Sequence, residues 1–208
     1  MLTQRQGQAD FRARSGRMGD VWTIAGTLNP VPALDRPDLL ADPVVAALRS
    51  LDPSDAARCA VAEIDPTLAD TAEFCDFYGS PLTASANCVV VAGKRGDVVR
   101  YAACVVLATT RADVNGVVRR RLDARRASFA PMDDAVSLSG MAYGGITPIG
   151  LPTDWPVLLS PEVAAAPELV VGSGVRHSKI LVPGDVLAKL PGAEVLTDLA
   201  RPVVMEPK

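Results

Sequence analysis

The chain has 208 residues, the size of one domain or of one domain with an extension. Its formal net charge is -3, which argues against a protein that coats nucleic acid by bulk electrostatics but allows a small basic patch. Hydrophobic residues make up 49%, yet no apolar run reaches the roughly 18 residues of a membrane span, so no membrane partner is expected. The first 20 residues hold no apolar signal core, and a cytoplasmic location is expected.

The cysteines and the histidine exclude several kinds of site. Cys59, Cys75, Cys88 and Cys104 are dispersed in apolar surroundings and form no CxxC pair, so we expect small buried hydrophobes in a reducing cytoplasm. His177 is the only histidine, which argues against a zinc site or a Ser-His-Asp triad. No metal and no organic cofactor is therefore expected.

The first part of the chain is predicted to be an extension followed by the domain. Residues 1–35 are polar and contain Gly and Pro, and Trp22 and Ile24 are candidates to pin this segment onto the body. The domain itself is expected over residues 36–208.

The first elements of that domain are two helices and a strand. Asp42 and Pro43 precede apolar residues spaced by three and four, which predicts a helix to about residue 51 with Asp42 as its N-cap. The alternation over 59–64 predicts a strand. A second helix is expected from Asp70, ending at Gly79.

Two strongly apolar strands follow, at 87–92 and 101–108, joined by a hairpin loop at 93–97. Their nearly continuous β-branched runs are typical of strands that are buried on both faces. Helices are then predicted over 113–122 and 131–138.

The stretch 139–152 holds four glycines and two prolines in fourteen residues. Gly permits φ > 0 and close approach to a ligand, and Pro stiffens the backbone, so a shaped binding loop on a scaffold is one interpretation. A plain pair of tight turns is the other.

After this loop, short strands and helices continue to alternate. Strands are predicted at 156–159, 169–171 and 180–182, helices from Pro161 and over 183–190, a second Gly loop at 172–174, and a closing strand from Val195. Interleaved strands and short helices predict a single α/β (α+β) domain with a mixed sheet.

This order of elements resembles the YbaK/EbsC (ProX-like) family of aminoacyl-tRNA deacylases, which is related to the editing insertion domain of prolyl-tRNA synthetase. The resemblance covers residues 42–200. It rests on the apolar hairpin, a helix headed by Arg111 and Asp113, the Ser139-Gly140 turn, the Gly-x-x-x-Pro match of Gly144 to Pro148, and the second Gly loop. It implies a curved mixed β-sheet flanked by short helices.

The resemblance also implies a function, namely trans-editing. The ester of a mischarged tRNA bearing a small amino acid would be hydrolysed at the acceptor end, with an aminoacyl-tRNA synthetase as a further partner and with no DNA. Backbone donors of the Gly-rich loop would bind the carbonyl, which becomes negative in the tetrahedral intermediate, and the terminal adenosine. The family's water is positioned with help from the substrate's ribose hydroxyl, so no protein nucleophile is required.

Carried onto this sequence, the resemblance assigns two sets of residues. The catalytic set is Asn87, Gly144, Gly145 and Thr147. The substrate-binding set is Gly140, Pro148, Gly150, Gly172, Ser173, Gly174, Arg111 and Lys179. Separately, the densest positive patch of the chain predicts weaker contacts with phosphates of the tRNA acceptor stem, through Arg119, Arg120, Arg125 and Arg126. The hydroxyls of Thr147 and Ser173 have an equal alternative, capping their own turns, and the arginines have the alternative of a solvated helix face.

One position departs from the family pattern. A lysine usually begins the first hairpin strand, and the matching residue here is Asn87, which carries no charge. Lys179, Arg176 and Arg111 are the substitute cations. Two other functions therefore stay open: a protein of the same fold that binds aminoacyl-tRNA or a nucleotide-like ligand without turnover, and a hydrolase of another small ester.

His177 and Cys88 are two further residues whose side chains could take part in chemistry. His177 is a weaker candidate for a general base, against an exposed or structural role. Cys88 is expected to point to the sheet face opposite Asn87 and to be a core residue, because nothing nearby would lower its pKa.

Overall fold

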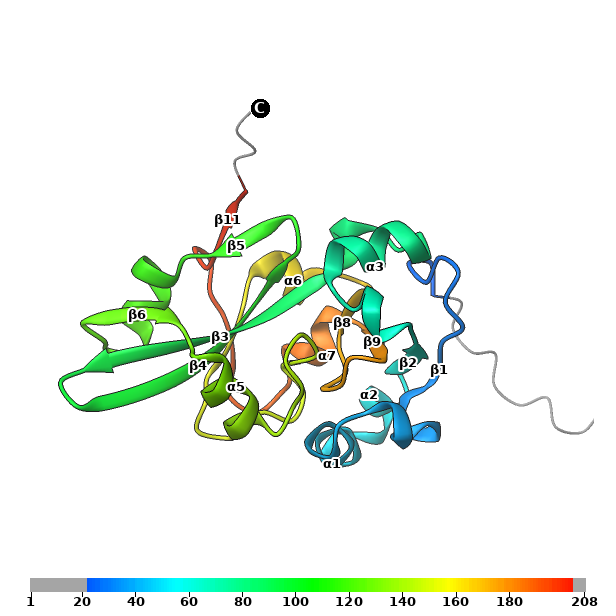
Figure 1. The fold of residues 1–208 in the computed structure, drawn as a ribbon, viewed down its shortest axis with the longest axis horizontal. Helices are drawn as coiled ribbons and strands as arrows, with labels where there is room; N and C mark the ends of the chain where they lie inside the picture. The colour runs from blue at the N-terminus through cyan, green and yellow to red at the C-terminus, as the bar shows by residue number, and fades with distance from the viewer. Residues whose placement is uncertain (1–21, 204–208) are drawn as a thin grey trace, which may run out of the picture.

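The computed structural model describes residues 22–203, and its largest sheet has five strands (Figure 1). β4 pairs antiparallel with β3 and parallel with β7, and β7 pairs parallel with β10, so the predicted mixed sheet is confirmed. In spatial order the strands are β10 (Ala193–Val195), β7 (Val157–Leu159), β4 (Val98–Leu107), β3 (Ala86–Arg95) and β6 (Arg126–Phe129).

A second, antiparallel sheet lies beside the first one (Figure 1). Its order is β1 (Val31–Pro32), β2 (Ala60–Glu63), β9 (Ser178–Val182) and β8 (Leu169–Gly172). An isolated parallel bridge joins Ser85, just before β3, to Val170 of β8. The two sheets therefore meet along the start of the long hairpin.

Short helices and one small ribbon complete the fold. The helices are α1 (Asp42–Ser50), α2 (Pro53–Ala56), α3 (Thr71–Tyr78), α4 (Arg119–Arg121), α5 (Met132–Ser139), α6 (Pro161–Ala165) and α7 (Gly184–Leu187). Short 3-10 turns lie at Ala33–Asp35, Pro37–Leu39, Pro66–Leu68 and Leu82–Ala84, and a π-helical segment, η5, at Val114–Val118. The ribbon pairs β5 (Thr110–Ala112) with β11 (Ala200–Pro202).

The core forms on both faces of the five-stranded sheet. All three residues of β7 are buried, as are five consecutive residues of β4, Ala102 to Val106, because helices and loops cover both sides. From α1, Val44, Val45 and Leu48 turn one apolar stripe into this core. The expectation of burial on both faces is therefore confirmed for the hairpin strand β4, whereas in β3 the residues Asn87 to Val89 are only half-buried.

Several element predictions need correction at their ends. The first hairpin strand extends to Arg95 and the second begins at Val98. Most of the predicted loop at 93–97 is therefore strand, and only Gly96 and Asp97 connect the two strands. The helix over 113–122 is real, but its first part is π-helical. The last helix ends at Leu187 rather than at residue 190. α1 begins at Asp42 with Ala41 as its N-cap, so the predicted Asp42 cap is one residue off.

The sequence analysis missed α2, β1, β5 and β6, and it predicted one closing strand where two occur, β10 and β11. The missed strands have only two to four residues each, too few to show an alternating pattern, and β6 contains no β-branched residue. Their pairing partners lie far away in the sequence. Local patterns carry no information about such strands.

The segment before α1 packs onto the body where it is described. Ile24 is buried beside Phe74 and half-buried Trp22 joins the same cluster, so the predicted contacts of both residues are confirmed. Thr23 donates from its amide N–H and its hydroxyl to the Glu168 carboxylate, at 2.9 and 2.7 Å. Residues 1–21 of the expected extension lie outside the described residues.

One aspartate fixes the start of the helical segment that carries Arg119 to Arg121. The Asp113 carboxylate accepts from the N–H groups of Gly116 and Val117, both at 3.2 Å, and pairs with Arg201 of β11 at 2.8 Å. Its side chain is 12% exposed. This carboxylate therefore caps η5 and ties it to the C-terminal ribbon.

We predict that Asp113→Ala lowers the free energy of unfolding by about 1–3 kcal/mol, because two helix-end amides and one guanidinium lose their acceptor. Urea denaturation measures the change. The exposed turn residue Asp97 provides the control, and Asp97→Ala should change stability by less than about 0.5 kcal/mol. Equal effects of the two substitutions would contradict the capping role.

Candidate active site

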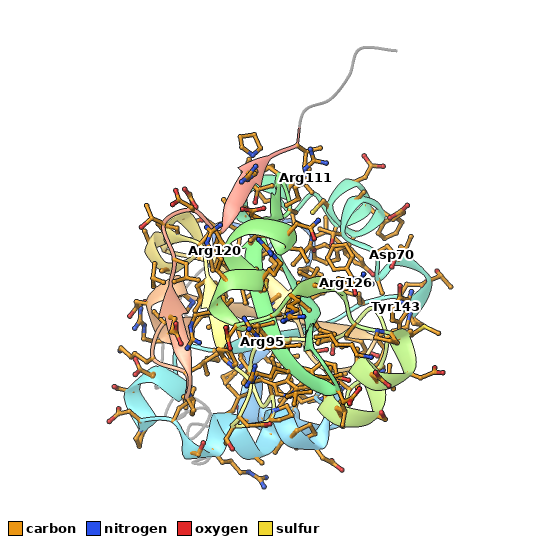
Figure 2. All side chains as sticks on the ribbon, turned by 90° about the vertical axis from the view of Figure 1, so that its left-hand side faces the viewer. Asp70, Arg95, Arg111, Arg120, Arg126 and Tyr143 are labelled. Carbon is orange, nitrogen blue, oxygen red and sulfur yellow. The ribbon has the colours of Figure 1, made fainter. Side chains whose placement is uncertain are left out.

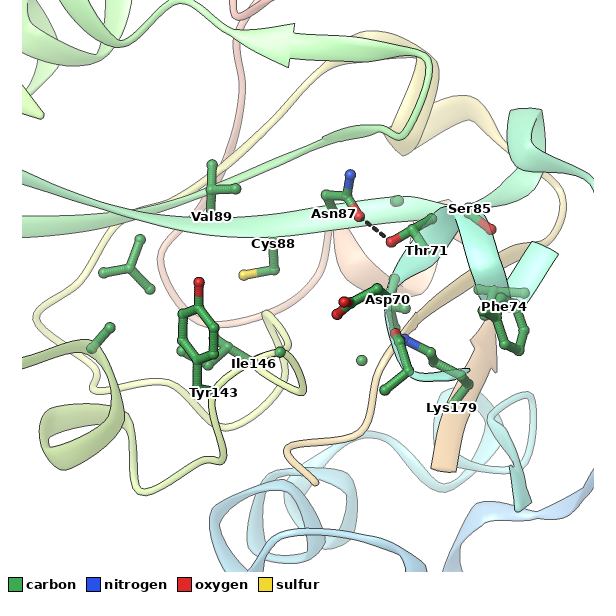
Figure 3. Close-up of a pocket in the computed structure, with 18 of the residues that line it drawn as sticks. Asp70, Thr71, Phe74, Ser85, Asn87, Cys88, Val89, Tyr143, Ile146 and Lys179 are labelled. Carbon is green, nitrogen blue, oxygen red and sulfur yellow. Dashed lines mark hydrogen bonds between the residues drawn. The ribbon is translucent and has the colours of Figure 1, made fainter. Parts of the chain in front are cut away.

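A cavity of about 590 Å³ opens where the two sheets meet (Figure 3). Its lining residues come from α3, β3, β8, β9 and the Gly-rich loop, and they are Ala69, Asp70, Thr71, Phe74, Ser85 to Val90, Phe129, Ala130, Met132, Ala135, Tyr143, Gly144, Ile146, Val170 to Gly172, and Lys179. Four residues assigned from the sequence, Asn87, Gly144, Gly172 and Lys179, therefore converge on one cavity.

One wall of the cavity depends on direct contact between the backbones of the two Gly loops. The Gly174 N–H donates to the Gly145 carbonyl at 2.7 Å, and the Ala142 N–H donates to the Gly174 carbonyl at 2.8 Å. A Cβ on Gly145 would lie 2.4 Å from the Val175 carbonyl oxygen, and a Cβ on Gly172 would lie 2.4 Å from the Gly145 oxygen. No side chain fits between these backbones.

The same loops also rest on the start of α1. The Ala41 N–H donates to the Ser173 carbonyl at 3.1 Å, and a Cβ on Gly150 would approach the Pro43 carbonyl oxygen to 2.4 Å. Gly140 ends α5 in the left-handed region at φ 67. The structure therefore gives Gly140 and Gly150, assigned to substrate binding, a role in holding the loop, and neither residue lines the cavity.

Two residues of the first Gly loop that line the cavity, Gly144 and Ile146, have backbone amides without an acceptor. Within residues 22–203 neither N–H donates a hydrogen bond. The Gly145 N–H, in contrast, donates to the Ala142 carbonyl at 2.9 Å. Gly144 and Ile146, rather than Gly145, are therefore the candidate backbone donors of this loop.

Lys179 places a buried ammonium at the wall of the cavity. It is 7% exposed, its Nζ donates to the Ala69 carbonyl at 2.7 Å, and it lies 5.3 Å from the centre of the Phe74 ring. Desolvation by burial lowers the pKa of Lys179, and the nearby charge of Arg176 lowers that pKa further. The cation that the sequence analysis named as a substitute is therefore in the cavity.

Arg176 lies at the edge of the cavity and connects two of its walls. Its Nη1 donates to the Tyr143 carbonyl at 3.4 Å, its Nη2 donates to the Pro66 carbonyl at 3.3 Å, and Nη1 lies 3.7 Å from a carboxylate oxygen of Asp70. Asp70 is the N-cap residue of α3, as predicted, but its side chain makes no capping hydrogen bond. This carboxylate thus stays near the cavity with Arg176.

Asn87 and Cys88 point to different sides of β3 (Figure 3). Asn87 Oδ1 accepts a hydrogen bond from Thr71 Oγ1 at 2.8 Å, which ties β3 to α3. Cys88 turns toward Tyr143 and Ile146, and burial raises the pKa of its thiol. Cys88 therefore faces opposite to Asn87, as predicted, but the face it occupies is that of the cavity, so its description as core alone was wrong.

Other assigned residues lie outside the cavity. Ser173 is buried and donates to the carbonyls of Val175 and Ser178, so its hydroxyl stabilises its own loop. Thr147 is fully buried, and its Oγ1 has no partner within residues 22–203. Pro148 and Gly174 are buried behind the cavity wall, whereas Arg111 is exposed on β5, away from Asp70 and Tyr143 (Figure 2).

His177 also lies outside the cavity. Its Nε2 is 3.5 Å from the Asp38 carbonyl oxygen, and its own carbonyl accepts from the Ile64 N–H at 2.9 Å. These contacts support the structural interpretation of the histidine rather than a general base.

Exposed apolar side chains surround the entrance. Phe129 is 64% exposed and Tyr143 is 61% exposed, although aromatic residues are only 4% of the chain. Both line the cavity, together with exposed Met132. Flat apolar surface at a mouth favours contact with a planar or apolar ligand.

The predicted tRNA-contact arginines separate into two groups. Arg119, Arg125 and Arg126 line a second cavity of about 770 Å³, whereas Arg120 does not. Arg126 begins β6, whose last residue, Phe129, reaches the first cavity.

The described residues 22–203 contain neither a membrane-spanning helix nor a cluster of metal ligands. No helix there is long and apolar enough to cross a membrane. Within the same range, no three His, Cys, Asp or Glu side chains gather as they would around a metal ion.

Comparison with known proteins identifies the family. The sequence model of the aminoacyl-tRNA editing domain matches residues 65–190, more than half of the chain. The chain belongs to the aminoacyl-tRNA editing domain family. The resemblance noted from the order of elements is thereby confirmed, and the match contains every residue that lines the first cavity.

Solved structures support the fold of this editing domain. A protein proposed to be a trans-editing enzyme for prolyl-tRNA synthetase shares 22% identity at a TM-score of 0.63, covering 76% of this chain and 96% of its own. A computationally designed epitope scaffold shares 21% identity at a TM-score of 0.63, covering 76% of this chain and 96% of its own. A hypothetical protein shares 18% identity at a TM-score of 0.59, covering 68% of this chain and 90% of its own. Comparison with curated proteins finds no match.

The sequence analysis missed several lining residues of the editing domain. Thr71 and Phe74 were treated only as parts of a helix, and Phe129 falls in the missed strand β6. Tyr143 lies inside the Gly-rich stretch that was singled out. Its position beside Gly144, in a chain with few aromatic residues, was the one available signal.

We predict that Gly145→Ala destabilises the protein more than Gly96→Ala. A methyl group on Gly145 meets backbone oxygen at 2.4 Å, whereas Gly96 has φ +61 and nothing within 4 Å. Gly96→Ala should therefore lower the free energy of unfolding by about 1–2 kcal/mol through backbone strain. Gly145→Ala should lower it by more, because the two loops must separate. Amide hydrogen exchange adds a local readout, since only Gly145→Ala should expose the N–H groups of Ala142 and Gly174. Unchanged protection of these amides would show that the loops tolerate the separation.

Proposed function

We propose that this editing domain hydrolyses the ester of a mischarged tRNA bearing a small amino acid, acting in trans. The observation that carries the proposal is the convergence of two free loop amides, Gly144 and Ile146, and the buried Lys179 ammonium on one cavity. A cytoplasmic location would follow from such a substrate, and a synthetase that produces the mischarged tRNA is the expected partner.

The proposed step is addition of water to the ester carbonyl carbon, followed by breakage of the bond to the ribose oxygen. The products are the free amino acid and the tRNA with its terminal hydroxyl restored. Negative charge develops on the carbonyl oxygen, and fixed N–H donors together with a nearby cation stabilise it more strongly than water does. Gly144, Ile146 and Lys179 are assigned this role.

The side chains at the cavity favour water over a protein nucleophile. Burial raises the pKa of the Cys88 thiol, so the reactive thiolate is disfavoured. Thr71 Oγ1 already donates to Asn87, and Ser85 Oγ lies 3.2 Å from the Cys75 sulfur. With His177 outside the cavity, no activated hydroxyl or thiol is found among its lining residues.

The apolar walls support a small side chain on the substrate. Ala69, Phe74, Ala86, Val170 and Val171 line the cavity around Lys179. A wall of this kind discriminates by size, at about 1–3 kcal/mol per methylene. Selection among small amino acids is accordingly expected to be modest.

A second candidate function is binding of aminoacyl-tRNA without turnover. It is favoured by Asn87, which stands at the family's lysine position and uses its side-chain oxygen on Thr71. The two functions differ in whether Lys179 replaces the missing charge.

The deciding experiment measures hydrolysis of tRNAs charged with Ala, Ser, Cys or Thr. We expect turnover of at least one ester, with kcat/KM reduced by about 10²-fold or more in Lys179→Met, as when an oxyanion donor is removed. Lys189→Met is the matched control, because Lys189 pairs with Asp55 at 2.7 Å and does not line the cavity. Intact esters with retained tRNA binding would support the non-catalytic function, and loss of both would reject the two proposals.

Stability gives an independent check on the charge of Lys179. Because its pKa is lowered from 10.5 in the folded protein, the unfolded chain binds this proton more tightly, and the charge destabilises the fold at neutral pH. That penalty diminishes as pH rises from the folded pKa toward 10.5. The stability difference between wild type and Lys179→Met should therefore favour Met at neutral pH and shrink in alkaline solution. A difference independent of pH would show that the lysine carries no such penalty.

A further inference from the structure

The second cavity is a basic groove on an otherwise acidic protein. Lys94, Arg119, Arg125 and Arg126 line it, with Asp134 as the only carboxylate among its lining residues. Asp134 Oδ2 accepts a hydrogen bond from Tyr101 OH at 2.9 Å. Within residues 22–203 none of the four cations lies within 4.0 Å of a carboxylate. These charges are therefore not neutralised by the fold.

The strand register places two of these positive charges directly opposite each other on neighbouring strands. Lys94 of β3 is directly opposite Arg126 of β6 in the antiparallel ladder. Directly opposed side chains share one face at about 4.5–5.5 Å between Cβ atoms, and like charges there are destabilising. Neighbouring arginines can be paired within the fold, as Arg95 is with Asp123 at 2.6 Å. Two cations that face each other across neighbouring strands without a carboxylate partner are expected where an anion binds between them.

The groove shares a wall with the proposed ester site. Along β6, Arg126 to Ser128 line the groove, and Phe129 and Ala130 line the first cavity. On α5, Asp134 borders the groove and Ala135 borders the cavity. Figure 2 shows Arg126 on β6 between Arg95 on one side and Tyr143 on the other. Three residue steps from Arg126 to Phe129 span about 10 Å, at roughly 3.3 Å per residue.

We propose that this groove binds the phosphates of the unpaired 3′ end of the tRNA, immediately before the esterified terminal nucleotide. Three stacked nucleotides span a similar length, at about 3.4 Å each. A cationic track next to exposed aromatic side chains is the arrangement that proteins use for single strands, and Phe129 at the junction offers a stacking face. The proposal rests on the function proposed above and names the surface that delivers its substrate.

The test compares two esters of the same amino acid, one on full-length tRNA and one on adenosine alone, which lacks the preceding phosphates. In the double variant Lys94→Ala/Arg126→Ala, kcat/KM for the tRNA ester should fall by roughly tenfold or more, and the slope of its salt dependence should decrease. Hydrolysis of the adenosine ester should stay within about twofold. Arg49→Ala is the matched control, because Arg49 is exposed on α1 and lines neither cavity. Equal losses on both esters, or no loss on the tRNA ester, would overturn the proposal.

Binding keeps the test independent of catalysis. The double variant should weaken affinity for an RNA hairpin with an unpaired 3′ tail and leave affinity for the blunt hairpin unchanged. If no ester is hydrolysed but the double variant loses affinity only for the tailed hairpin, the proposed role of the groove is supported and the proposed hydrolysis is rejected. If both hairpins lose affinity equally, the groove is a general duplex contact and the assignment to the 3′ end is wrong.

Discussion

The contact between the backbones of the two Gly loops is the constraint on which the candidate site depends. Gly145 and Gly172 approach so closely that neither position has room for a Cβ. The second loop joins β8 to β9, and the ladder of these strands places Lys179 opposite Gly172. The contact therefore holds the first loop against the hairpin that carries the buried lysine. In this way the loop amides and the ammonium are brought to the same cavity.

The buried lysine is a local compromise between stability and function. Desolvation lowers the pKa of Lys179, and its one hydrogen bond to the Ala69 carbonyl and its contact with Phe74 offset only part of the cost. An apolar residue of similar length would pack at the same place without that cost. A charge retained against its own desolvation is typical of functional sites. Here the charge lies in the same cavity as Asn87, the residue that the resemblance aligns with the family's strand lysine.

The sequence predicted those parts of the fold that depend on local pattern. The apolar hairpin, the αL residue Gly79 and the Pro161 helix start were correct because each follows from neighbouring residues. β5 and β6 were missed because β5 pairs with a strand about ninety residues later and β6 with one about thirty residues earlier. Their stability comes from those partners rather than from β propensity.

For the candidate site as well, the sequence predicts some features, and others depend on tertiary packing. Of the residues that the sequence analysis assigned to the site, the structure places Asn87, Gly144, Gly172 and Lys179 at one cavity, because loops and strand ends of one fold converge at a fixed place. The resemblance does not determine the direction of individual side chains. Ser173 turns into its own loop, and Cys88 rather than Asn87 faces the Gly-rich loop, since one residue along a strand reverses the face. Such directions depend on tertiary packing that a motif does not contain.

Net charge and local charge have different consequences for this protein. At -3 overall, long-range attraction to a polyanion is weak, and salt screens charges beyond about 8–10 Å. The positive charge around Lys94 and Arg126 is confined to one groove, so it acts on phosphates that are already close. Its few contacts favour rapid release of a tRNA, which suits an enzyme whose product differs from its substrate by only one ester. Discrimination between acylated and free ends would then come from the adjoining cavity, where Gly144, Ile146 and Lys179 are proposed to meet the acyl group.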